Sequence, residues 1–123
     1  MSLSSTIVLK DNAAADKTFV QNQLDGSGSQ RIDVSSNLSN PRVMKLSHSS
    51  SGKGVDAVDR HLVQFASTET DVNGKVVTVI VNTTLSVPRN SQISRTDIDD
   101  LLAFTKNFFA VSANVDAILR NES

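Results

Sequence analysis

The side chains that could do chemistry in this chain are two histidines, three aspartates close in sequence, and many serines. His48 and His61 do not share an element with carboxylates at ligand spacing, so we interpret each as a strand histidine that meets cross-strand neighbours. Asp97, Asp99 and Asp100 could bind Mg²⁺, but they fall in the first turn of a predicted helix, whose dipole favours anions. No serine lies in a Gly-x-Ser-x-Gly pattern, and the glycine-rich stretches lack the flanks of a phosphate loop. The sequence therefore predicts neither an enzyme nor a cofactor or metal.

Composition narrows the class of protein further. The 123 residues suit one domain, and a net charge of −1 gives no bulk attraction to nucleic acid, so any RNA binding must come from a local arrangement of Lys and Arg. Cysteine is absent, which excludes disulfides and thiolate metal sites. Without a basic leader or an apolar run of about 18 residues, we expect a soluble chain with no secretion signal and no membrane span. Aromatic residues make up only 4% of the chain, which is a thin supply for a small core and a hint that a second chain completes the burial.

The stretch from Val76 to Val87 organises the rest of the sequence. Side chains of a strand alternate between two faces, and β-branched residues dominate here, so the stretch predicts one long strand that Pro88 ends. One face is nearly all apolar and needs a cover, while the other becomes polar. The apolar positions are the odd ones, Val77, Val79, Val81, Thr83, Leu85 and Val87.

The remaining pattern predicts an α+β fold. An N-terminal β-hairpin at about 5–23 is followed by alternating strands at 31–35, 42–49 and 55–66, joined by short polar turns as in an antiparallel meander. From Ile98 the apolar spacing changes to steps of three and four, which indicates an amphipathic helix capped by Ser94 or Thr96. A break near 112–114 precedes a second short helix. We expect the helical stripe to cover the apolar face of the Val76 strand.

The polar face of the long strands is the remaining candidate for a site. It carries two positive charges among short hydroxyls and amides on a rigid platform. Because antiparallel sheets commonly have one solvated face, an ordinary solvated surface is the alternative interpretation. Sheets that read single-stranded RNA often present aromatic side chains, and this face has none. Its predicted members are Lys45, Ser47, Ser49, Arg60, Gln64, Thr78, Asn82 and Thr84.

The layout resembles the coat proteins of the small single-stranded RNA bacteriophages, the levivirus family. The resemblance is carried by Thr-Ile-Val-Leu-Lys-Asp at 6–11, by Val-Ile-Val-Asn-Thr-Thr-Leu-Ser-Val-Pro at 79–88, and by the spacing from that proline to the helix. It implies one coat-protein domain over 1–123, with a hairpin at about 5–23, a five-stranded antiparallel sheet at about 31–88 and helices at about 95–121. It further implies homodimers in which the two C-terminal helices pack over the sheet of the partner. Dimers would then form an icosahedral virion capsid, with the sheet facing the packaged single-stranded RNA genome.

The same resemblance implies the RNA-binding residues. Asn82 corresponds to an asparagine that touches an RNA hairpin in the best-known members, and Ile80 stands where those members stack an aromatic side chain on a base. The other implied contacts are Lys45, Ser47, Arg60, Leu62, Gln64 and Thr84, with Leu62 in place of an expected lysine. Such binding would repress translation and mark the genome for packaging in the bacterial cytoplasm. The loop at 68–75 resembles the one that meets its copies at the symmetry axes.

A second interpretation is a small cytoplasmic dimeric RNA-binding or adaptor module that forms no shell. Both interpretations name the chain itself and RNA as partners, and neither involves a membrane. An electron micrograph of the purified protein would distinguish them, because only the first predicts uniform particles.

Overall fold

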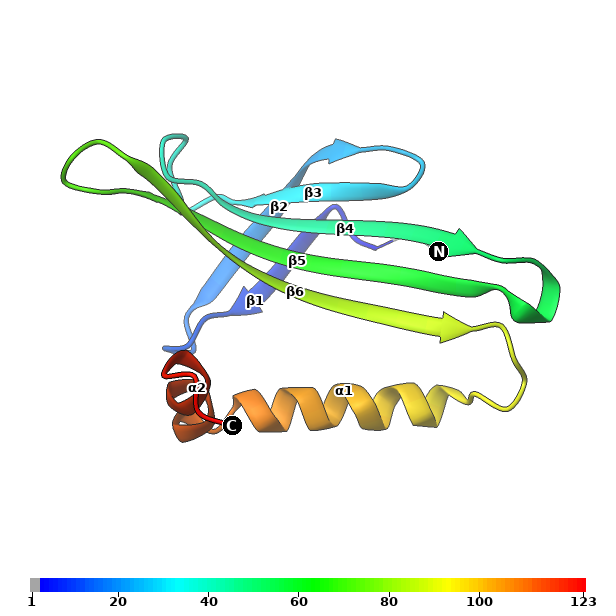
Figure 1. The fold of residues 1–123 in the computed structure, drawn as a ribbon. Helices are drawn as coiled ribbons and strands as arrows, with labels where there is room; N and C mark the ends of the chain where they lie inside the picture. Colours follow the sequence, from blue (N-terminus) through cyan, green and yellow to red (C-terminus); the bar gives the residue numbers. More distant parts are fainter. Residues whose placement is uncertain (1–2) are drawn as a thin grey trace.

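The computed structural model describes residues 3–123, and in this part of the chain the strands form one six-stranded antiparallel sheet (Figure 1). Each strand pairs with the next along the chain. The strands are β1 (Thr6–Lys10), β2 (Asp16–Leu24), β3 (Gly28–Asp33), β4 (Arg42–Ser51), β5 (Val58–Thr70) and β6 (Val76–Pro88). The helices are a short 3₁₀ turn η1 (Gly54–Asp56), α1 (Arg95–Phe109) and α2 (Ser112–Leu119). The predicted α+β class and antiparallel order are confirmed.

The division into a separate hairpin and a five-stranded sheet is wrong in one respect. The nine-residue β2 pairs with β1 on one side and with β3 on the other, so the hairpin is continuous with the sheet. An irregularity between Gln21 and Gln23 interrupts the β2–β3 register, which locally raises the twist. As a result β1 and the start of β2 curl away from the plane of the long strands (Figure 1).

Several strand boundaries differ from the predictions because turns with their own hydrogen bonds take over. The predicted strand 31–35 ends at Asp33, since the Asp33 carboxylate accepts hydrogen bonds from the backbone N–H and hydroxyl of Ser35 at 2.9 and 2.8 Å. Val34 is therefore left 63% exposed rather than sharing a strand face with Ile32. The strand predicted from Val55 starts at Val58 because η1 occupies the preceding residues. β6 ends at Pro88, as predicted.

The core lies where the curled hairpin meets the middle of β4 and β5. Phe19, Met44 and Leu46 are buried, and Phe19 packs edge-on against Phe65 with ring centroids 6.0 Å apart. Strand register places Met44 opposite Phe65, so the β4–β5 pair presents its apolar side to the hairpin. This cluster is small for a domain of this size, which agrees with the thin supply of aromatic residues in the sequence.

Two ionic side chains are buried beside this cluster. The guanidinium of Arg31, only 1% exposed, donates to the backbone oxygen of Ser4 through Nε at 3.1 Å and Nη2 at 2.7 Å, and to the hydroxyl of Ser29 at 2.7 Å. Asp33 is fully buried and lies 3.4 Å from Nη1 of Arg42. These hydrogen bonds meet the rule that buried polar groups are satisfied, and they fasten the N-terminal segment to the sheet.

Helix α1 begins with the predicted Ser94 cap. The Ser94 hydroxyl accepts a hydrogen bond from the backbone N–H of Asp97, and the Asp97 carboxylate accepts from the backbone N–H of Ser94, which forms a capping box. The predicted break between the two helices lies at 110–111 rather than near 112–114, since Val111 is the cap of α2 and residues 112–114 form its first turn. Neither helix is long and apolar enough to cross a membrane within the described residues.

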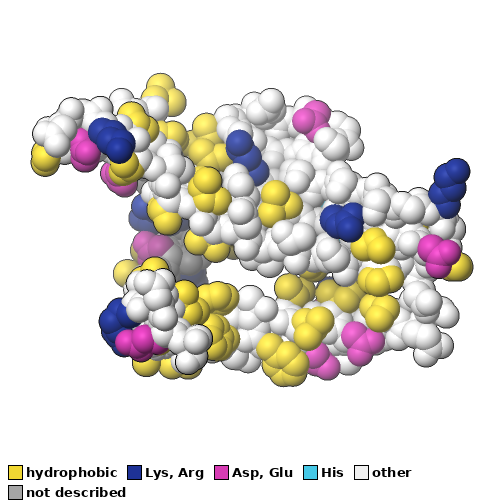
Figure 2. Space-filling view, in the orientation of Figure 1, with side chains coloured by type: hydrophobic (Ala, Val, Ile, Leu, Met, Phe, Trp, Pro, Cys, Tyr) yellow, Lys and Arg dark blue, Asp and Glu magenta, His cyan; other side chains and the backbone are white. Residues whose placement is uncertain are grey.

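Within one chain the helical stripe does not cover the sheet, so its cover by the helices of a partner stays a prediction. Helix α1 packs mainly on α2 and runs beside β6 rather than over the sheet face (Figure 1). A cavity of about 170 Å³ separates the two, with Ile98, Leu102 and Thr105 on one wall and 83–87 of β6 on the other. Figure 2 shows hydrophobic side chains gathered along this opening.

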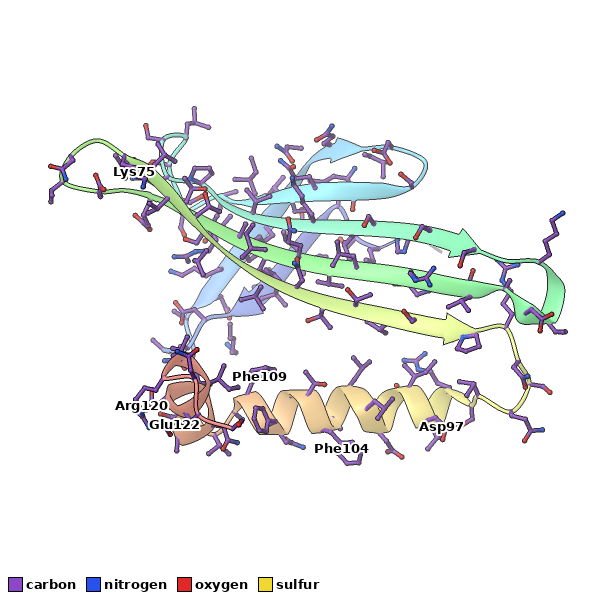
Figure 3. The ribbon with its side chains drawn as sticks, in the orientation of Figure 1. Lys75, Asp97, Phe104, Phe109, Arg120 and Glu122 are labelled. Carbon is purple, nitrogen blue, oxygen red and sulfur yellow. The ribbon has the colours of Figure 1, made fainter. Side chains whose placement is uncertain are left out.

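Apolar surface is consequently exposed on both elements. On β6, Val79 is 64% and Val81 is 61% exposed. On α1, Phe104 is 66% exposed and lies on the side away from the sheet, whereas Phe109 lies on the side towards it (Figure 3). Because large exposed apolar patches mark interaction surfaces, β6 and α1 together form a candidate association surface.

Candidate nucleic-acid interface

Strand register brings the predicted polar positions together on one face of β4, β5 and β6. Each row across the sheet contains one residue from each strand. The rows are Val43–Ala66–Ile80, Lys45–Gln64–Asn82, Ser47–Leu62–Thr84 and Ser49–Arg60–Ser86. The apolar core residues lie on the opposite face. All eight predicted RNA-binding residues therefore share one surface, and their binding role stays a prediction.

Four of these residues line one open cavity of about 360 Å³. They are Lys45, Ser47, Leu62 and Gln64. The opposite wall is formed by the β2–β3 turn and β3, and it includes Asp25, Ser27 and Gln30. The sequence did not predict these residues as part of the site. Arg60, Ile80, Asn82 and Thr84 lie outside this cavity, on the flat part of the face.

Gly28 allows the β3 wall of the cavity to lie close to β4. A Cβ at Gly28 would lie 2.1 Å from the backbone oxygen of Leu46, so no larger residue fits without moving a strand. The signal in the sequence is the Asp25-Gly-Ser-Gly stretch, one of the glycine-rich stretches that lack the flanks of a phosphate loop. In the structure, Asp25 orders that turn by accepting hydrogen bonds from the backbone N–H groups of Ser27 and Gly28, both at 2.8 Å.

The cavity carries balanced charge. Hydrogen bonds from Ser27 and Gly28 lower the pKa of Asp25, so its carboxylate is ionised at neutral pH. Lys45 lines the same cavity and supplies a positive charge. A phosphate group would be repelled by Asp25, whereas an uncharged ring with hydrogen-bonding edges would meet one donor, one acceptor and several amides and hydroxyls. The chemistry of this cavity suits a nucleobase better than a phosphate.

The flat part of the face is organised by an amide pair. The side-chain nitrogen of Gln64 donates to the side-chain oxygen of Asn82 at 2.9 Å, which fixes the orientation of both amides. The NH₂ group of Asn82 remains a donor that this bond does not use. Two rows further along the face, Arg60 donates to the hydroxyl of Ser51 at 2.8 Å and lies at the surface. Ile80 is 52% exposed and offers an aliphatic contact but no ring for stacking.

A separate ionic cluster lies on the opposite face, near the end of β6. Asp59 accepts two hydrogen bonds from Arg89, at 2.9 Å from Nε and 2.8 Å from Nη2, and a third from the hydroxyl of Ser50 at 2.9 Å. These contacts, with Arg89 contributing most, lower the pKa of Asp59 to about 2. Because Arg89 lies just beyond Pro88, the cluster fastens the end of β6 to β5. It is structural, and we do not assign it to the candidate interface.

No protein-family model matches the sequence, and no curated protein matches it either. Solved structures, however, match nearly the whole chain. A virus-like particle of Beihai levi-like virus 21 superposes with a TM-score of 0.69 at 10% identity, covering 99% of this chain and 98% of the other. A virus-like particle of bacteriophage NT-214 gives 0.65 at 20% identity, with coverages of 97% and 96%. The bacteriophage EMS014 coat protein gives 0.63 at 18% identity, with coverages of 85% and 72%.

These matches define the fold as one used by capsid-forming proteins. More narrowly, it is the coat-protein fold of the levi-like bacteriophages, which confirms the resemblance seen in the sequence. At these identities the similarity concerns the fold, and the function is argued separately below.

Proposed function

We propose that this chain is the coat protein of a levi-like bacteriophage, which dimerises and then assembles into a shell around single-stranded RNA. The observation that carries the proposal is the unpartnered apolar surface of β6 and α1 in a fold shared with virus-like particles. The location in the virion and the non-enzymatic, structural role both follow from this proposal.

The free edge of β6 supports a dimer built by strand pairing. Hydrogen bonding alternates along a strand, and residue 89, just past β6, donates its N–H to Ala57 on the β5 side at 2.9 Å. Odd residues of β6 therefore bond to β5, and even residues, such as Asn82 and Thr84, direct their N–H and C=O groups to the open edge. An exposed edge of this length is a template for pairing with another chain. An identical β6 related by a two-fold axis would supply an antiparallel partner.

Helix α1 supports the same dimer from the other side. It extends past its own β6 edge and stands off from it, so a second sheet joined at that edge would lie against the apolar side of α1. In return, the helix of the second copy would cover Val79 and Val81 of the first. The exchange buries both apolar surfaces, which neither chain can bury alone.

The face that carries Lys45 and Asn82 would then continue across the two-fold axis. In the dimer, each charge and each amide occurs twice on one platform, so positive charge gathers locally although the net charge is −1 per chain. Lys45 and Arg60 would contact phosphates that pass outside the cavity, without sequence preference. The cavity beside Lys45 would hold an unstacked base, and the NH₂ group of Asn82 would read another base edge.

Electron microscopy and sedimentation of the purified protein test the proposal. We expect uniform closed particles that contain RNA and that dissociate to dimers rather than to folded monomers. Dimers that never form particles would favour the alternative of a small RNA-binding or adaptor module. Folded monomers at micromolar concentration would contradict both interpretations.

The two RNA roles can be separated by mutation. Lys45→Ala should weaken binding to all RNA hairpins alike and reduce the slope of log affinity against log salt by about 1 for each phosphate that is no longer neutralised. Asn82→Ala should instead reduce discrimination among hairpins by about 1–3 kcal/mol. Filter binding of the dimer to a hairpin pool at two salt concentrations measures both effects.

Lys53→Ala is the matched control, because it removes the same charge from the exposed β4–β5 connection rather than from the candidate face. It should leave both quantities close to those of the unaltered protein. Equal losses for preferred and random RNA in the Asn82 variant would exclude base reading by that residue. Unchanged RNA binding by both the Lys45 and the Asn82 variants would mean that this face is only a solvated inner surface of the shell.

A further inference from the structure

The two histidines of the chain form a pair on the face opposite the candidate RNA surface. His48 on β4 lies directly across from His61 on β5, with their Nδ1 atoms 2.9 Å apart. The backbone N–H of His48 donates to Ser27 on the other side of β4 at 2.7 Å, so it does not bond to β5. The two histidines therefore occupy a non-hydrogen-bonded position of the β4–β5 ladder, where facing side chains approach most closely.

A separation of 2.9 Å between two ring nitrogens requires a bound proton or cation between them. With both rings neutral, one Nδ1 carries a proton and donates it to the lone pair of the other. Two imidazole nitrogens this close together are also a ligand pair that suits Cu²⁺, Ni²⁺ and Zn²⁺. We propose that His48 and His61 form a binding site for a divalent transition-metal ion, coordinated through both Nδ1 atoms.

The spacing also selects among metals. Two nitrogens about 2.05 Å from a metal and 2.9 Å from each other subtend an angle of about 90° at the metal. That angle fits neighbouring positions of a tetragonal or octahedral ion, so Cu²⁺ and Ni²⁺ bind with little movement of the strands. A tetrahedral Zn²⁺ needs the nitrogens about 3.3 Å apart, and β4 and β5 would have to separate slightly. On binding, the donor ring passes its proton from Nδ1 to Nε2 through solvent, so both rings remain neutral.

The surroundings leave room for the remaining ligands. His48 is exposed and borders an open groove of about 330 Å³, which can hold the water molecules that complete the coordination. Asp59 lies two residues before His61 on the same strand face, but both of its oxygens are occupied by Arg89 and it supplies charge rather than a bond. No group of three or more metal-ligating side chains occurs among the described residues. The site is therefore a two-histidine chelate within one chain.

Isothermal titration of untagged protein with NiCl₂ and with CuCl₂ tests the site. We expect one Ni²⁺ per chain for the unaltered protein. His48→Gln and His61→Gln should each lower the affinity tenfold or more, and the double variant should lose little further, because either change destroys the chelate. Ser49→Ala is the matched control, since it alters the neighbouring residue of β4 on the opposite face and should bind Ni²⁺ normally. Single variants that bind as tightly as the unaltered protein would overturn the assignment.

Two further measurements guard against variants that fold poorly. Ni²⁺ should raise the melting temperature of the unaltered protein and of Ser49→Ala but not of the histidine variants, because the ion joins two strands of the native state only. The electron paramagnetic resonance spectrum of the Cu²⁺ form should show coupling to two imidazole nitrogens. A spectrum without nitrogen coupling would refute the proposal, even if every variant were unstable.

Discussion

Replacing Thr84 with proline tests the proposed dimer edge directly. Thr84 lies opposite Leu62, and its N–H points to the open side of β6 by the alternation described above. Proline is tolerated on an edge strand where the missing N–H would face solvent. We therefore expect the Thr84→Pro chain to keep the β5–β6 ladder and to lose pairing with a second copy.

The magnitude follows from the two-fold symmetry. Each substituted strand loses one donor and leaves the facing carbonyl of its partner unsatisfied, which costs about 1–3 kcal/mol. A symmetric interface contains the change twice, so the dimer should lose about 2–6 kcal/mol. This corresponds to a dissociation constant weakened by about 30-fold at least and by about 20,000-fold at most. Sedimentation equilibrium over a dilution series measures the shift.

Two control variants separate the edge from the fold. Thr84→Val keeps the backbone donor and the size of the side chain, so it should dimerise like the unaltered protein. Thr83→Pro removes an N–H that bonds to β5, so it should lower the melting temperature of the chain itself. If Thr84→Pro dimerises with unchanged affinity while its circular dichroism is native, β6 is not the dimer edge and the argument fails.

Three other predictions follow from the structure. Phe19→Ala should lower the free energy of unfolding in urea by about 3–5 kcal/mol at fixed protein concentration, whereas Leu38→Ala, 94% exposed, should change it little; equal midpoints would mean the hairpin does not form the core. Replacing Asn73 and Gly74 with alanine strains the turn, where Gly74 has φ of 80°, and should change particle size or stability but not dimer formation, as seen by microscopy. Asp59 has a lowered pKa, so its stabilising contribution should be complete above pH 3.8 and be lost as pH falls towards about 2; Asp59→Asn should melt with no such dependence from that site.

Local chemistry made much of this fold predictable. The alternation in β4 and β6 and the β-branched residues of Val76 to Val87 were sufficient to define strands and their faces, because side-chain period is a local property. The Ser94 cap and the spacing from Ile98 to Phe109 defined α1 for the same reason. The polar residues of the candidate face were assembled correctly because register in a meander follows from short turns.

The features that were missed depend on contacts distant in sequence. The wall of the cavity formed by Asp25 and Gln30 required β3 to approach β4 at Gly28, which a loop-like sequence does not reveal. Arg31 is a charged residue, so the sequence pattern alone does not predict that it is buried. Its burial depends on its hydrogen bonds to Ser4, which is distant in the sequence. The position of α1 relative to the sheet could not be derived from one chain. The apolar stripe of α1 does not pack on the sheet of its own chain.

The sequential order of the sheet has a consequence for synthesis. Since every strand pairs with the one before it, each new strand of the nascent chain meets its neighbour as soon as it leaves the ribosome, and the sheet can form progressively from β1. The elements with exposed apolar surface, β6 and α1, are translated after the other strands. Most of the chain is thus folded before its association surface exists, which limits the time in which an incomplete polypeptide could aggregate with its copies.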